Sequence, residues 1–153
     1  MNFSLYFIIT FIVGIISYCL NWNSLCNIDP NCSVDILNTS NKLLFTSSIV
    51  LSALSFISIF KTKEIIVFYR FIFLFIALCF IVLSIINLVN GKQIKNFPKT
   101  TTPATTPIKS VENIYIECVS NITSVLNLLI GIFIGILTVY YLKNEIFNYF
   151  SNI

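Results

Sequence analysis

Four long apolar runs constrain this chain more than any other feature of its sequence. They are Phe3–Leu20, Leu43–Phe60, Phe71–Val89 and Ser124–Leu142. A helix that crosses about 30 Å of hydrocarbon needs roughly 17–25 apolar residues, and each run is about that long. Only 10% of the residues are charged, against about 25% in a typical soluble domain. We therefore predict an all-α membrane protein: a four-helix transmembrane bundle with two polar loops on one face, folded as a single tetraspan membrane domain over residues 1–153.

The first apolar run has a second interpretation, as a cleaved signal peptide with the small residues Ser17 and Cys19 before the cut. A signal peptide begins with a positively charged segment, which this run lacks. We expect the run to be retained as a helix.

Polar segments separate the four runs, at Asn21–Lys42, Lys61–Arg70 and Asn90–Thr123. The middle one is so short that the second and third helices must form an antiparallel hairpin. The third begins as a low-complexity linker at 99–107, KTTTPATTP, which is typical of a stiff extended spacer; O-glycosylation and threonine phosphorylation are alternatives. It turns amphipathic from Val111, so we predict that the fourth helix begins before the membrane.

Basic residues give the orientation only weakly. With both termini in the cytosol, that side carries four Lys/Arg and the other side five, so their totals do not decide the matter. Their density is highest in the short link, where Lys61, Lys63 and Arg70 are candidate topology anchors. We predict that Arg70 snorkels to the cytosolic interface and that both termini are cytosolic. A cellular membrane and a viral membrane both fit the sequence.

Cysteine placement supports this orientation. Cys19, Cys26, Cys32 and Cys118 all fall at one face of the membrane, while Cys79 lies alone in the middle of a span. Such clustering is typical of an oxidising compartment, so we predict one or two disulfides among these four, with a staple between Cys26 and Cys32. A redox-active pair is a weaker alternative, because the chain has no Cys-x-x-Cys motif.

Two asparagines of the first polar loop, Asn31 and Asn38, begin Asn-x-Ser/Thr sequons and are candidate glycosylation sites. The chain has about as many sequons as its asparagine, serine and threonine content gives by chance, so they carry little weight.

Small and polar residues form one stripe along the fourth run, and Gly131 and Gly135 within it make a GxxxG pair. Helices in lipid associate where small residues let backbones approach and where polar side chains bond across the contact. The stripe therefore predicts a specific helix–helix interface, within the bundle or between copies. Weaker stripes on the other runs favour a compact bundle, with a water-filled pore as the alternative. The predicted packing residues of the fourth helix are Ser120, Ser124, Asn127, Gly131, Gly135 and Thr138.

Several residue types that catalytic and binding sites require are missing from the sequence. Histidine, the commonest general base and metal ligand, is absent. No Asp or Glu falls within the four runs, which argues against a proton relay or a cation-coupled transporter. The nine Lys/Arg are too scattered for nucleic-acid binding. We expect no enzymatic activity, catalytic residue, metal site, cofactor or small-molecule substrate.

The layout resembles tetraspan families such as claudins, tetraspanins and MARVEL proteins in architecture alone, since the claudin Gly-Leu-Trp and tetraspanin Cys-Cys-Gly motifs are absent. The leading hypothesis is a structural or assembly protein that packs with the lipid bilayer and with other membrane proteins or copies of itself. A viral membrane component and an accessory subunit of a larger membrane complex both fit. A homo-oligomeric channel lined by Ser/Thr/Asn stripes is the alternative, and a membrane thiol oxidoreductase is a remote one.

Overall fold

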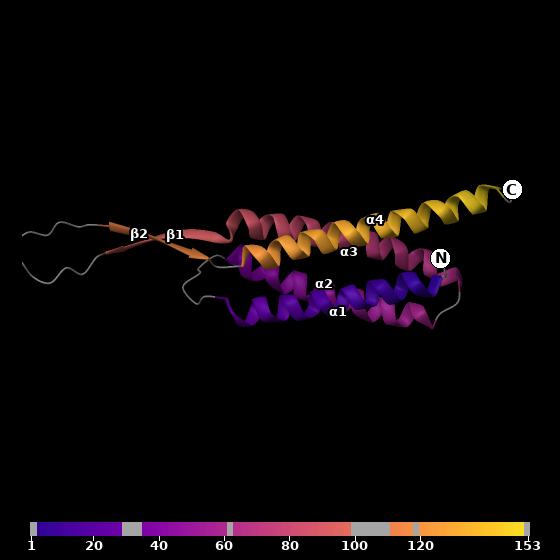
Figure 1. Cartoon of the computed structure of the whole chain (residues 1–153), viewed down its shortest axis with the longest axis horizontal. Coiled ribbons are helices and arrows are strands. Elements are labelled where there is room, and N and C mark those ends of the chain that lie inside the picture. Colours follow the sequence, from indigo (N-terminus) through magenta and orange to yellow (C-terminus); the bar gives the residue numbers. More distant parts are fainter. Residues whose placement is uncertain (1–2, 29–34, 61–62, 99–110, 118–119, 152–153) are drawn as a thin grey trace, which may run out of the picture.

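Four long helices lie side by side along the length of the molecule (Figure 1). The computed structural model describes residues 3–28, 35–60, 63–98, 111–117 and 120–151. Within these residues, all four helices are long and apolar enough to span a membrane. The predicted four-helix transmembrane bundle is confirmed, and the chain is a multi-pass membrane protein. The helices are α1 (Phe3–Cys26), α2 (Asp35–Ile59), α3 (Lys63–Asn90) and α4 (Asn121–Ser151).

The helices extend beyond the apolar runs that predicted them. They contain 24, 25, 28 and 31 residues, whereas a span of the hydrocarbon alone needs about 20. Apolarity predicts the part of a helix that lies in lipid, but helical hydrogen bonding continues until a residue interrupts it. No glycine or proline lies between Leu20 and the end of α1, while Gly91 directly follows the last residue of α3, as is common at helix C-termini.

The second polar segment contains a β-hairpin. Strand β1 (Lys92–Pro98) pairs antiparallel with β2 (Val111–Glu117), with Lys92 opposite Glu117 in the register. The prediction that the fourth helix starts near Val111 is therefore wrong. Residues 111–117, VENIYIE, are rich in β-branched and aromatic types, which favour a strand. The low-complexity linker 99–107 lies outside the described residues.

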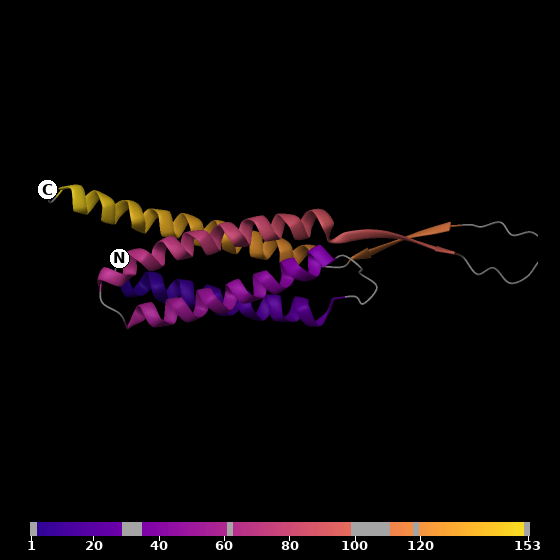
Figure 2. The ribbon, with the colours of Figure 1, turned by 180° about the vertical axis from the view of Figure 1, so that it is seen from behind.

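The hairpin, the C-terminal end of α1 and the N-terminal end of α2 lie at one end of the bundle, and the N-terminal end of α1 and the C-terminal end of α4 lie at the other. Figures 1 and 2 show this arrangement from opposite sides, with β1 and β2 projecting beyond the helices. The two polar segments are therefore on one face, as the four crossings require. The C-terminal end of α2 and the N-terminal end of α3 also lie at this second end.

Each helix contacts two neighbours, and these contacts differ in extent. The α1–α2 and α3–α4 contacts are the most extensive, the α2–α3 contact is smaller, and the α1–α4 contact is the smallest of the four. Glycines allow the two extensive contacts. A Cβ atom on Gly14 would lie 3.2 Å from the Ser52 backbone, and one on Gly131 would lie 2.9 Å from the Cβ of Phe80.

Large apolar side chains fill the middle of the bundle. Leu51, Phe73, Phe80 and Ile134, which come from three of the helices, are each 0% exposed. Isoleucine, leucine, phenylalanine and valine also cover the outside, as expected of a surface that faces lipid rather than water.

Candidate functional site

Many polar side chains within the spans are buried in the bundle, where they form separate clusters. One lies at the end of the termini and contains charged groups. The others lie at the end of the loops and contain asparagine and serine. The buried polar residues are Thr10, Ser17, Asn21, Ser40, Asn41, Ser48, Ser55, Ser58, Arg70, Ser84, Asn87, Ser124, Asn127 and Thr138.

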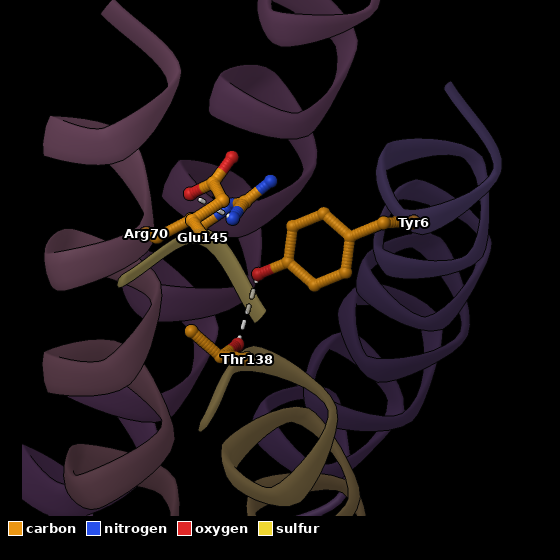
Figure 3. A network of polar contacts seen from close by, with 4 residues as sticks. All are labelled: Tyr6, Arg70, Thr138 and Glu145. Atoms are coloured by element: carbon orange, nitrogen blue, oxygen red, sulfur yellow. Dashed lines mark hydrogen bonds and ion pairs between the residues drawn. The ribbon is translucent and has the colours of Figure 1, made fainter. Parts of the chain in front are cut away.

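The charged cluster joins three helices (Figure 3). Arg70 of α3 is 0% exposed and forms an ion pair with Glu145 of α4, whose side chain is 25% exposed. The guanidinium carbon of Arg70 lies 5.6 Å from the ring centres of both Tyr6 and Tyr141, within the range of a cation–π interaction. The hydroxyl groups of Tyr6 on α1 and Thr138 on α4 share a hydrogen bond of 2.9 Å.

The burial of Arg70 corrects the prediction that it snorkels to the interface. Arg70 is nine residues from Cys79, the middle of the candidate span Phe68–Asn90, a displacement of about 13 Å along the helix. This depth is near the edge of the hydrocarbon, where lipid-facing arginine would reach for water. Arg70 instead faces inward because α4 supplies a carboxylate at the same level.

Glu145 was missed because α4 is longer than its apolar run. The candidate span of α4 is Asn121–Asn148 and includes Glu145, whereas the run identified in the sequence stops at Leu142. The four apolar runs contain no carboxylate, but the longer candidate spans include Asp35 and Glu145, so the argument against proton or cation coupling no longer holds. The signal in the sequence is the spacing from Thr138 through Tyr141 to Glu145, which places all three on one face of a helix.

A cluster at the other end, which we call the amide layer, consists of Ser17 and Asn21 of α1, Ser48 of α2 and Asn127 of α4. Asn21 and Asn127 exchange two hydrogen bonds: Asn127 Nδ2 donates to Asn21 Oδ1 over 2.8 Å, and Asn21 Nδ2 donates to Asn127 Oδ1 over 3.2 Å. Asn21 Nδ2 also lies 2.9 Å from Ser48 Oγ, and the hydroxyl groups of Ser17 and Ser48 are 2.9 Å apart. Interhelical hydrogen bonds in membranes contribute about 0.6 kcal/mol on average, so the layer orients helices more than it stabilises them.

A second amide cluster joins α2 to α3. Asn87 Oδ1 accepts a hydrogen bond of 2.7 Å from Ser40, and Asn87 Nδ2 donates one of 2.9 Å to Asn41 Oδ1. The Nδ2 atom of Asn41 and the hydroxyl of Ser84 are buried and have no hydrogen-bond partner among the described residues.

The structure divides the predicted packing stripe of α4 between two surfaces. Ser124, Asn127 and Thr138 are buried inside the bundle, and Ser120 is exposed before the first turn of the helix. Gly131 packs tightly on α3, as its 2.9 Å approach to Phe80 shows.

Gly135, the second glycine of the GxxxG pair, lies at an open position. A Cβ atom there would meet only the Cβ of Ala77, at 3.8 Å, which is an ordinary contact. Gly135 lies in an apolar groove between α3 and α4 on the outside of the bundle, with Leu74 and Val139 among its lining residues. The two glycines therefore act differently, although the motif is symmetrical.

The cysteines are not joined where the structure describes them. Cys19 and Cys26 are exposed free thiols, and Cys79 is free and half-buried. Cys19 and Cys26 stand seven residues apart on α1, about 10 Å along its axis, which exceeds the span of a disulfide. The predicted disulfides thus find no support, and Cys32 and Cys118 lie outside the described residues.

The remaining predicted residues have mixed placements. Asn38 is exposed, but it lies in the first turns of α2 rather than in a loop. Lys63 is the first residue of α3. Asn31 and Lys61 lie outside the described residues.

Comparisons with known proteins give no assignment: no family model, no curated protein and no solved structure matches this chain. The candidate site is therefore interpreted from its own geometry.

Proposed function

We propose that this chain is a non-enzymatic structural or assembly protein of a membrane, which packs with other membrane proteins. A viral membrane component and an accessory subunit of a larger membrane complex are both roles of this kind. One observation carries the proposal. The polar side chains of the spans bond mainly to one another inside the bundle, and the outer surface of the helices consists largely of apolar side chains.

Such a distribution of side chains suits association more than chemistry. Arg70 and Glu145 pair their charges, and the side chains of Asn21 and Asn127 exchange hydrogen bonds. The outer surface is open to lipid and to neighbouring spans, and it includes the half-buried Gly135.

A channel is the second candidate function, and one observation favours it. The hydroxyl groups of Ser55 and Ser84 are buried without a hydrogen-bond partner among the described residues. Buried polar atoms of this kind often bind water. A conducting state would need the apolar middle around Leu51, Phe80 and Ile134 to become wet.

Native mass spectrometry of complexes extracted from membranes in mild detergent tests the assembly role. We expect the chain in a stoichiometric complex with a different membrane protein. A population of monomers and self-oligomers alone would refute the proposal. Gly135→Leu is the informative variant, because a Cβ atom at this position has ordinary space and the groove that Gly135 lines is on the outer surface. Ile136→Leu, in the same groove, is its control. Ion flux into liposomes that contain the purified protein tests the channel, and sealed liposomes would eliminate it.

A further inference from the structure

The contact between α1 and α4, which we call the seam, differs from the other three contacts of the bundle. The chain connects α1 to α2, α2 to α3 and α3 to α4, whereas α1 and α4 are its first and last elements. The seam is also the smallest of the four contacts. Neither close glycine contact, at Gly14 or Gly131, lies in it. The seam is therefore where this bundle opens with the least rearrangement.

The two ends of the seam are closed differently. At the end of the termini, Tyr6 packs against Tyr141 with ring centres 4.8 Å apart. Its ring also lies beside the Arg70 guanidinium (Figure 3). At the end of the loops, the reciprocal bonds between Asn21 and Asn127 cross the seam. Within the described residues, no aromatic pair crosses it at that level. The amide end is consequently the easier one to open.

An amide pair can exchange its partner. Asn127 gives Asn21 one donor and one acceptor, and any carboxamide on another helix at the same depth offers the same two groups. In hydrocarbon there is no water to satisfy an amide that has lost its partner, so a replacement must carry donors and acceptors of its own. Asn127 lies about 10 Å from the middle of its span, which sets the depth of that replacement.

We propose that the seam admits a transmembrane helix of a partner protein, and that an Asn or Gln side chain of this helix replaces Asn21 on Asn127. This inference rests on the proposed assembly function and names the surface and the chemistry of the partner. A helix with apolar side chains alone is rejected, because it would leave Asn127 unpaired.

The test uses the full chain in phosphatidylcholine liposomes with two synthetic probes. One probe is a polyleucine transmembrane peptide with a single Asn seven residues from its centre, and the other has Leu at that position. Association is measured by energy transfer between labels on the peptide and on the protein. We expect the Asn peptide to bind about 10-fold more tightly than the Leu peptide, as one or two membrane hydrogen bonds allow.

Variants of the two seam asparagines should act in opposite directions. Asn127→Leu should abolish the preference for the Asn peptide, whereas Asn21→Leu should tighten the binding of this peptide, because it removes the internal competitor. Asn87→Leu breaks the α2–α3 amide cluster instead and should leave the preference unchanged. If Asn21→Leu does not give a monodisperse, helical protein, Asn21→Ala removes the same competing side chain.

Equal binding of both peptides to the wild type would overturn the inference. Equal changes in the affinity for the Asn peptide from Asn21→Leu and Asn127→Leu would overturn it too. Either result would leave the assembly function standing if native mass spectrometry finds a partner. A chain that occurs without any partner would refute the assembly function itself, whatever the peptides do.

Discussion

Removing Glu145 should destabilise the bundle more than removing Arg70, and removing both should cost least. The perturbations are Glu145→Leu, Arg70→Leu and the double variant. Glu145→Leu leaves a guanidinium that is 0% exposed without its carboxylate. Arg70→Leu leaves a carboxylate whose side chain is 25% exposed and can turn toward the headgroups. The double variant replaces both charges by apolar side chains in an apolar solvent.

The magnitudes follow from what each variant leaves behind. Breaking a buried ion pair from one side costs about 3–5 kcal/mol. The rings of Tyr6 and Tyr141, each 5.6 Å from the guanidinium, remain and compensate in part, so we place Glu145→Leu near 3 kcal/mol, at about the lower end of that range. The partial exposure of the Glu145 side chain lowers the cost of Arg70→Leu to about 1–2 kcal/mol. An apolar replacement of a whole ion pair is often neutral, so we expect a change of about 1 kcal/mol or less for the double variant.

Far-UV circular dichroism during titration from mild detergent into dodecyl sulfate measures these free energies of unfolding. The expected coupling energy between the two positions is about 3 kcal/mol or more, well above the 0.3–0.5 kcal/mol within which independent sites add. Leu129→Ile, at an exposed apolar position of α4, is a control that should leave the free energy almost unchanged. If the free-energy changes of the two single variants add up in the double variant, the charges do not interact. If Arg70→Leu costs more than Glu145→Leu, the burial of Arg70 relative to Glu145 is refuted.

Three further predictions concern other contacts. Gly131→Ala should destabilise the bundle by about 1–3 kcal/mol in the same titration, because its Cβ would come within 2.9 Å of α3, whereas Gly135→Ala has ordinary space and should be neutral or stabilising; equal effects would contradict the division of the GxxxG pair. Tyr6→Phe and Thr138→Val should each cost about 0.6–1.5 kcal/mol and should not add in the double variant, since they break the same hydrogen bond; full additivity would argue against that bond. Cys26 is an exposed free thiol, so iodoacetamide should alkylate it equally with and without prior reduction, as read by peptide mass spectrometry; labelling only after reduction would restore the disulfide.

The sequence predicts the bundle well because apolarity and helix length are local properties. Each apolar run carries its own evidence for a span, and the short basic link alone dictates the α2–α3 hairpin. The inward positions of Ser17, Asn21, Ser48 and Asn127 agree with the small and polar stripes that the sequence contains. The strand at 111–117 was missed because Ile114 and its apolar neighbours satisfy a helical spacing as well as a β-propensity, and seven residues are too few to decide between them.

The charged cluster could not be predicted from single segments. Arg70 at the start of an apolar run is typical of an interfacial anchor, and Glu145 after the end of another is typical of a helix terminus in water. Their pairing depends on the register of α3 against α4, which the close contact of Gly131 fixes. Neither segment by itself predicts that register, so the contact between Arg70 and Glu145 is seen only in the assembled bundle.

The polar groups of the interior determine which helices are neighbours. Lipid tails are as apolar as leucine, so apolar side chains gain little from choosing one helix over another. Asn127 exchanges two hydrogen bonds with Asn21 of α1, Asn87 bonds to Ser40 and Asn41 of α2, and Arg70 pairs with Glu145 of α4. An exchange of neighbours would leave an amide or a charge unpaired in hydrocarbon. The free-energy cost of such an unpaired group exceeds the free energy that its bonds contribute to stability. The same logic makes the seam selective: the amide that holds α1 in place sets the chemistry that a competing helix must supply.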